Sequence, residues 1–349
     1  MIGIDIFSGA GGMALGAHMA NIDIEFAADC DKFALQTYKH NFPNTHVYLG
    51  DIKNISILPF AKKEEQTVLF GGPPCQGFST SNQKTRSLSN DKNWLFKEFI
   101  RITTSVMPNW VVFENVKGIL ETANGVFVEQ LIHDLESIGY TVNSGVLNAK
   151  DFGVPQTRSR FFAVGNLHGI RFELPHKLTN PGPTTWDAIG DLPSLMVGAS
   201  KSRLEYLSDP CSDFSKKMRG GLSICSNHLV TKNADYVIER YKHIPPGGNW
   251  QNIPDKLMSN YKNHTRCHTG IYRRLNPDEP SVVIGNFRKN MLIHPLEDRG
   301  LSVREAARLQ SFPDNFEFKG SIGFQQQQVG NAVPPLLAKA IFQKIQSYI

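Results

Sequence analysis

The opening of the chain limits its fold most strongly, because an apolar run, a glycine-rich turn and a helical pattern follow one another there. Residues 2–7 have the pattern of a strand, residues 8–12 supply the turn, and residues 13–20 have helical spacing. Such a turn lets the backbone approach a ligand closely, which predicts a cofactor loop between a strand and a helix. The glycine spacing also fits the dinucleotide fingerprint, so a nicotinamide oxidoreductase stays open at this point.

Four further apolar runs end in side chains suited to ligand binding. Asp29 stands about twenty residues beyond the glycine turn, where a ribose-binding acid is expected. In an open parallel sheet the carboxyl ends of the strands share one edge, so these side chains are expected to meet in one crevice. The runs, each with the side chain that follows, are 24–28 with Asp29, 46–49 with Asp51, 67–70 with Cys75 and 110–113 with Glu114.

Cys75 follows two prolines and precedes a glutamine. Proline fixes φ and removes a backbone donor, so Pro73 and Pro74 predict that the chain leaves the sheet there and presents the next side chain at the strand end. A lone cysteine is more often a small core residue. The glycine turn upstream and Glu114 downstream favour a nucleophile instead.

Six segments in this order resemble the motifs of one family, the DNA cytosine-C5 methyltransferases. The resemblance spans nearly the whole chain and implies an α/β fold: a doubly wound mixed sheet of the Rossmann-like, S-adenosylmethionine-dependent type, with a smaller inserted target-recognition domain. The segments are Asp5 to Gly12, Pro74-Cys75-Gln76, Glu114-Asn115-Val116, Gln156 to Arg160, Arg304 to Pro313 and Gln328 to Pro334.

The resemblance implies a reaction and a set of residues for it. Carbon 5 of cytosine is a weak nucleophile, so a thiolate, from Cys75, first adds at carbon 6 while a carboxyl group, Glu114, acts at N3. The target base must be swung out of the helix for this attack. The implied catalytic residues are Cys75, Glu114, Asn115, Arg158 and Arg160, the two arginines holding the base and the flanking phosphate. The implied S-adenosylmethionine pocket contains Phe7, Gly9, Gly11, Gly12, Asp29, Asp51, Ile52, Pro74, Leu95, Asn331 and Val333.

The composition changes in the middle of the chain, where the strand pattern fades. Residues 171–300 carry 18 Lys and Arg against 13 Asp and Glu, so the formal charge of +5 lies entirely there. This favours phosphate binding. We therefore expect a catalytic and cofactor domain over 1–171, a target-recognition domain over 172–300, and a return to the first domain over 301–349. The residues expected to contact DNA are Gln76, Ser79, Ser81, Asn249, Arg273 and Arg274.

Two helical patterns are expected in the returning segment. Residues 334–346 have an apolar stripe with prolines at the start, and this helix is expected to cover the first strand. Residues 301–312 predict a second helix, in which Ser302 and Glu305 have the spacing of a capping box.

Several function classes are disfavoured by composition. There is no signal-peptide pattern and no apolar run of membrane length, and the five cysteines form no Cys-x-x-Cys pair, so we expect a protein of the bacterial cytoplasm. The histidines show no ligand pairing, and no metal is expected. We expect a monomer that binds double-stranded DNA, with a cognate restriction endonuclease implied by the resemblance. Three alternatives remain: a tRNA cytosine methyltransferase, an NAD-dependent oxidoreductase and a non-catalytic DNA-binding module.

Overall fold

The structure is a computed structural model that describes residues 1–55, 65–74, 95–260, 270–289 and 291–349. The chain divides into two compact units. The first unit contains residues 1–152, 159–177 and 333–349, and the second contains residues 153–158 and 178–332.

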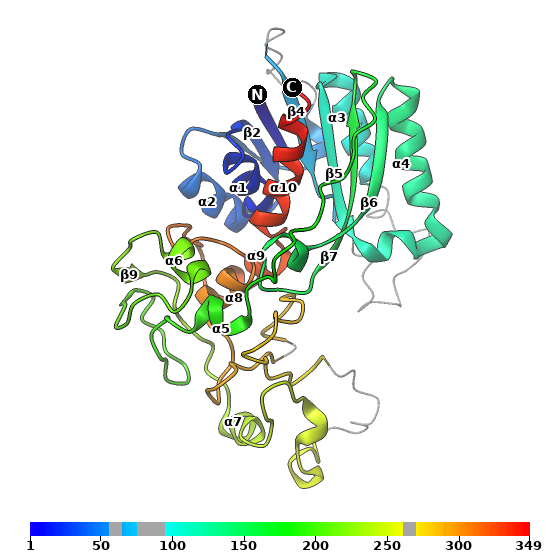
Figure 1. The fold of residues 1–349 in the computed structure, drawn as a ribbon. Helices are drawn as coiled ribbons and strands as arrows, with labels where there is room; N and C mark the ends of the chain where they lie inside the picture. Colours follow the sequence, from blue (N-terminus) through cyan, green and yellow to red (C-terminus); the bar gives the residue numbers. More distant parts are fainter. Residues whose placement is uncertain (56–64, 75–94, 261–269, 290) are drawn as a thin grey trace. The chain divides into compact units, whose positions relative to one another are not determined.

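The first unit is built on a seven-stranded sheet with strand order β3-β2-β1-β4-β5-β7-β6 (Figure 1). The first five strands of this order run parallel, and β7 is antiparallel to both β5 and β6. The predicted α/β fold with a doubly wound mixed sheet is thus confirmed. The strands are β1 (Ile2–Ile6), β2 (Asp23–Asp29), β3 (His46–Leu49), β4 (Thr67–Gly71), β5 (Trp110–Val116), β6 (Thr141–Asn148) and β7 (Ser159–Asn166).

Helices cover both faces of this sheet. Leu69 of β4 lies in a core with α3 and α4, in which the rings of Phe99 and Phe113 are 5.4 Å apart. Side chains alternate along a strand, so the next residue, Phe70, faces the other way, and its ring lies 5.0 Å from that of Phe342 in α10. The helices of this unit are α1 (Gly12–His18), α2 (Lys32–Asn41), α3 (Phe96–Val106), α4 (Val126–Ser137) and α10 (Pro335–Gln346).

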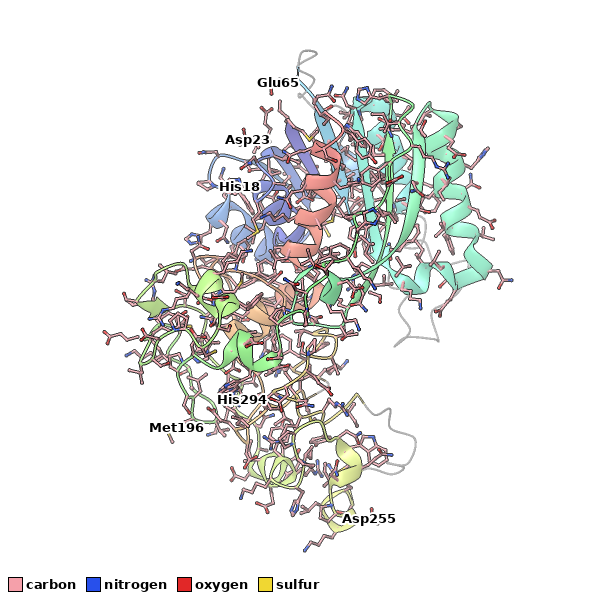
Figure 2. All side chains as sticks on the ribbon, viewed as in Figure 1. His18, Asp23, Glu65, Met196, Asp255 and His294 are labelled. Carbon is pink, nitrogen blue, oxygen red and sulfur yellow. The ribbon has the colours of Figure 1, made fainter. Side chains whose placement is uncertain are left out.

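The helix predicted over residues 334–346 is α10, and it packs against α1 as the last element of the chain. Figure 1 shows the two in contrasting colours beside β1, since they come from opposite ends of the sequence. In Figure 2 the labelled Asp23 and Glu65 mark the amino edge of the sheet, where β2 starts and the chain enters β4. The carboxyl ends of the parallel strands lie at the opposite edge.

The second unit has little regular structure and is held by buried ion pairs. Arg308 pairs with Asp314 at 2.6 Å and also with Asp191, and all three side chains are inaccessible to solvent. Arg299 pairs with Glu305 at 2.6 Å. The elements of this unit are α5 (Thr185–Ile189), β8 (Leu204–Glu205), α6 (Asp213–Arg219), β9 (Ile224–Cys225), α7 (Asp235–Tyr241), α8 (Val303–Leu309) and α9 (Ile322–Asn331).

Helix α8 begins with the predicted capping box. The Ser302 hydroxyl accepts a hydrogen bond from the Glu305 N–H at 3.0 Å, and the Glu305 carboxylate accepts one from the Ser302 N–H at 2.7 Å. The boundaries of the units differ from the expected ones, however. Both α8 and α9 belong to the second unit, so the chain returns to the first unit at Val333 and not at residue 301. The short stretch 153–158 also belongs to the second unit.

Candidate active site

The glycine turn between β1 and α1 is fixed by Asp29, the last residue of β2. The Gly9 N–H donates to Oδ2 of Asp29 at 2.8 Å, and the Asp31 N–H donates to Oδ1 at the same distance. Burial raises the pKa of Asp29, against the opposing effect of these two hydrogen bonds. The backbone φ of Gly11 is +92°, a value that L side chains rarely adopt, so this position requires glycine.

Three polar groups are buried at this turn. The Ser8 hydroxyl has no hydrogen-bond partner among the described residues, although Ser8 is only 9% exposed. Asp5 lies beneath the turn, and its carboxyl accepts a hydrogen bond from the Tyr38 hydroxyl at 3.2 Å. Burial raises the pKa of Asp5 well above its ordinary value. The turn is therefore a buried polar site that contains one hydroxyl without a partner among the described residues.

The other expected cofactor residues lie on separate elements. Asp51 follows β3, is exposed, and accepts a hydrogen bond from the Lys53 N–H at 3.0 Å. Ile52 is buried in the core, and Phe7 packs against the same core with a φ of +58°. The remaining members are Gly12 at the start of α1, Leu95 before α3, exposed Pro74, exposed Asn331 at the end of α9 and buried Val333.

Glu114 lies inside β5, one strand over from β4, and is nearly buried. Its Oε1 pairs with Nε of Arg160 at 2.9 Å, and both side chains are about one-tenth exposed. Its Oε2 points to the chain after β4: a Cβ on Gly72 would lie 2.6 Å from this oxygen. Arg160 from β7 thus holds one carboxylate oxygen, and the missing side chain of Gly72 leaves room for the other.

The neighbouring Asn115 holds the same stretch of chain. Its Nδ2 donates to the Pro73 carbonyl at 3.2 Å, and its Oδ1 accepts from the Val116 N–H at 2.9 Å. Residues 72 and 73 are therefore fixed against β5, two residues before Cys75. Cys75 itself, with Gln76, Ser79 and Ser81, lies outside the described residues.

Arg158 does not have the position expected of a base-binding residue. It is 2% exposed, and its guanidinium donates to the carbonyls of Ile284 at 2.9 Å and of Gly330 and Ala332 at 3.0 Å. These bonds use the guanidinium within the second unit, so the expected contact of Arg158 with the target base is corrected. Arg160, the second arginine of this motif, pairs with Glu114.

The expected DNA-reading arginines also differ from each other. Arg274 is 4% exposed, and its guanidinium donates to the carbonyls of Ile244, Tyr241, His294 and Glu297 and to the carboxylate of Asp298. Such a side chain cannot reach a base, so the expected DNA contact of Arg274 is corrected to a structural role. Arg273 is half-buried and stays a candidate for DNA contact.

Asn249 is half-buried and stays a candidate for DNA contact. Its Oδ1 accepts a hydrogen bond from the Gln251 N–H at 2.9 Å and so caps the short 3-10 helix Trp250–Asn252. Paired recognition of adenine needs the oxygen and the nitrogen of the amide together. The cap uses one lone pair of this oxygen and leaves the second, so the cap and a base contact are compatible.

Sequence reasoning missed Gly72, Ser8 and the buried pair of Asp5 with Tyr38. The double glycine before the two prolines was a possible signal for a close approach, but it does not say which side chain comes near. Within the described parts of the chain, no group of three or more His, Cys, Asp or Glu residues is arranged to hold a metal ion. Over those same residues, no helix has the length and apolar character needed to cross a membrane.

Comparison with known proteins gives a single family. The family model described as C-5 cytosine-specific DNA methylase matches residues 1–347. Type II methyltransferase M1.HphI of Haemophilus parahaemolyticus is 36% identical over 347 residues, which cover 98% of this chain and 86% of that protein. Type II methyltransferase M.DdeI of Desulfomicrobium norvegicum is 32% identical over 369 residues, which cover 99% and 88% of the two chains.

Solved structures give the same result for the fold. A putative DNA modification methyltransferase encoded within a prophage of E. coli superposes with a TM-score of 0.81 at 25% identity, covering 99% of both chains. The Dnmt2 methyltransferase of S. pombe superposes with a TM-score of 0.60 at 16% identity, covering 100% of this chain and 99% of that one. The second likeness concerns the fold alone.

Proposed function

Because the chain belongs to the family of C-5 cytosine-specific DNA methylases, and is thus a DNA (cytosine-5)-methyltransferase, we propose how its residues perform the transfer. The methyl donor is S-adenosylmethionine, the target cytosine is flipped out of duplex DNA, and Cys75 forms a covalent adduct with it. The family membership sets aside the nicotinamide oxidoreductase and the non-catalytic DNA-binding module.

The observation that carries this proposal is the anchoring of residues 72 and 73 on β5. Glu114 and Asn115 are consecutive residues, and both act on the segment that leads to Cys75. This geometry supports a site in which the Cys75 thiol and the Glu114 carboxyl contact the same cytosine ring. Placement of two reacting groups around one substrate lowers the barrier by removing the need to bring them together.

The chemistry follows from these placements. The Cys75 thiolate adds to carbon 6 of cytosine, and Glu114 protonates or strongly hydrogen-bonds N3, so that electron density moves to carbon 5. Carbon 5 then takes the methyl group, while the donor's sulfur would keep the electron pair of the broken carbon–sulfur bond and leave as a neutral thioether. A base removes the proton from carbon 5, the bond from sulfur to carbon 6 breaks, and the thiolate is regenerated. Arg160 orients Glu114 throughout, because its guanidinium holds Oε1.

The residues at the glycine turn fit the methyl donor. The unpartnered Ser8 hydroxyl is a buried group that a polar ligand would satisfy. Asp29 and Asp51 would hold the ribose hydroxyls and the adenine amino group, while Phe7 and Leu95 would pack on the donor. The sulfonium of S-adenosylmethionine supplies the electrophilic methyl group when it is bound.

The second unit is proposed to select the DNA sequence. Arg273 stands between Tyr272, which is fully buried, and Arg274, whose guanidinium is held by four carbonyls and a carboxylate. Its two neighbours fix its backbone, and an arginine fork placed in this way is suited to a guanine edge. The names of the Type II relatives favour a cognate restriction endonuclease as the functional partner. A monomer acting on the nucleoid completes the proposal.

Methyl transfer with tritiated S-adenosylmethionine tests this function. Wild-type protein should label duplex DNA at cytosine and leave tRNA unlabelled, and Cys75→Ala should label neither. Donor binding by Cys75→Ala, measured by calorimetry, should match the wild type and so shows that the variant is folded. Labelling of tRNA in preference to DNA would contradict the proposed substrate.

A further inference from the structure

The residues 153–158 are embedded in the second unit although the sheet strands of the first unit flank them in sequence. They pair with the chain around Ser281: the Thr157 N–H donates to the Ser281 carbonyl at 2.8 Å, and the Ser281 N–H donates to the Pro155 carbonyl at 2.9 Å. Gln156, which lies between Pro155 and Thr157 in sequence, has a fully buried side chain. This stretch therefore acts as a support for the segment that starts at Ser281.

Three buried side chains extend that support. Gln156 accepts a hydrogen bond from the Ile284 N–H at 3.0 Å and donates to the side chain of Gln310 at 3.0 Å. Arg158 donates to the Ile284 carbonyl at 2.9 Å. Gln310 donates to the Val329 carbonyl at 2.7 Å. Both backbone polar groups of Ile284 are thus bonded to one buried cluster, which we call the Gln156–Arg158–Gln310 brace.

The chain just beyond the brace forms an ordered, positively charged turn. Ile284 and Phe287 are 0% and 2% exposed and anchor it, whereas Asn286, Arg288 and Lys289 are exposed. The Phe287 N–H donates to the Gly285 carbonyl at 2.8 Å, and the Lys289 N–H donates to the Asn286 side chain at 3.1 Å. Two cations thus project from a backbone that is fixed from within.

We propose that the turn 285–289 contacts the phosphate backbone of the substrate DNA through Arg288 and Lys289, and that Arg158 is the positioning residue for this contact. The inference rests on DNA being the substrate. A fixed turn loses little conformational entropy on binding, so its two charges contribute more to affinity than the same charges on a loose loop. Phosphate contacts set register and orientation without reading bases, so the turn adds affinity for every sequence.

Equilibrium binding to duplex DNA over a range of salt concentrations tests the contact. Arg288→Ala and Lys289→Ala should each weaken binding equally for methylatable and unrelated duplexes. Each should also lower the salt slope, the magnitude of the slope of log K against log[salt], by about one. Arg288→Lys keeps the charge and should keep the slope. Lys216→Ala removes another exposed cation of the same unit, on α6, and should leave both quantities unchanged.

Two results would overturn the proposal: unchanged slopes in both turn variants, or an equal loss in Lys216→Ala. Methylation of DNA by the wild type is measured alongside, so that a failure of the proposed function is seen separately from a failure of the turn. For the positioning role, Arg158→Lys should lose DNA affinity, because the compact ammonium cannot reproduce a planar fork that donates to three separated carbonyls. If Arg158 acts through the turn, adding Arg288→Ala and Lys289→Ala to Arg158→Lys should cost less affinity than the sum of the separate losses, whereas fully additive losses would assign Arg158 to general stability instead.

Discussion

The substitution Gly72→Ala tests the placement of the Glu114 carboxylate without touching that residue. The added Cβ would lie 2.6 Å from Oε2, whereas ordinary contact begins at 3.4 Å, so the carboxylate must retreat by about 0.8 Å. The φ of Gly72 is not in the left-handed region, so the alanine backbone itself is unstrained. Because the atom that moves is the end of a flexible side chain, folding should lose less than about 1 kcal/mol.

Catalysis should suffer more than folding, since a displacement of about 1 Å in a reacting group can reduce the rate by about 10²-fold. We expect kcat for methyl transfer to fall by about 10-fold to 10²-fold, as for a displaced general acid, while Tm changes by only a few degrees. Gly300→Ala is the matched control, because its Cβ would meet its nearest neighbour at an ordinary 3.7 Å. A Gly72→Ala enzyme with wild-type kcat would refute the assigned position of Glu114.

Three further predictions follow from the described contacts. Asp29→Ala should raise the dissociation constant of S-adenosylmethionine by about tenfold or more, as for loss of a charged hydrogen bond, and leave that for DNA nearly unchanged in calorimetry. Equal changes in the two dissociation constants would contradict the proposed position of the donor pocket. Arg273→Ala should change selectivity by about 1 to 3 kcal/mol at particular bases in methylation mapping. Arg274→Ala should instead lower stability by about 1 to 3 kcal/mol or more, because it leaves the carbonyls of Ile244, Tyr241 and His294 without their buried donor; the reverse pattern would exchange their roles. For Glu305, burial opposes ionisation, but Arg299 holds the pKa of its carboxyl well below the ordinary value. The stabilisation from this ion pair is therefore complete above about pH 4.3, the pKa in the unfolded chain, and is lost as the pH falls further. The Tm of Glu305→Gln should approach that of the wild type on acidification, and a difference in Tm that stays constant with pH would contradict this.

Sequence reasoning placed several acidic side chains at the carboxyl edge of the sheet because their positions depend on local signals. An apolar run followed by an acid or a glycine places Asp29, Asp51 and Glu114 near strand ends whatever the rest of the chain does. The final helix α10 was found in the same way, from its apolar stripe and opening prolines. These features need only periodicity and turn chemistry.

The arginines show where this reasoning stops. Arg158 and Arg274 look like ligand-binding residues in the sequence, but backbone carbonyls that are distant in the chain hold both guanidinium groups. An arginine that braces loops and one that binds DNA have the same local pattern, and only the tertiary contacts separate them. The return of the chain at Val333 escaped prediction for the same reason, because the capping box of α8 says where a helix starts and not which unit it joins.

Covalent trapping on DNA that contains 5-fluorocytosine tests the central claim most directly. Fluorine at carbon 5 cannot be removed as a proton is, so the adduct with Cys75 should persist after methyl transfer. Wild-type protein with S-adenosylmethionine should give a denaturation-resistant complex with the fluorinated duplex and none with ordinary cytosine, and Cys75→Ala should give neither. A stable complex formed by Cys75→Ala, or no complex from an active wild-type enzyme, would contradict the assignment of Cys75 as the nucleophile.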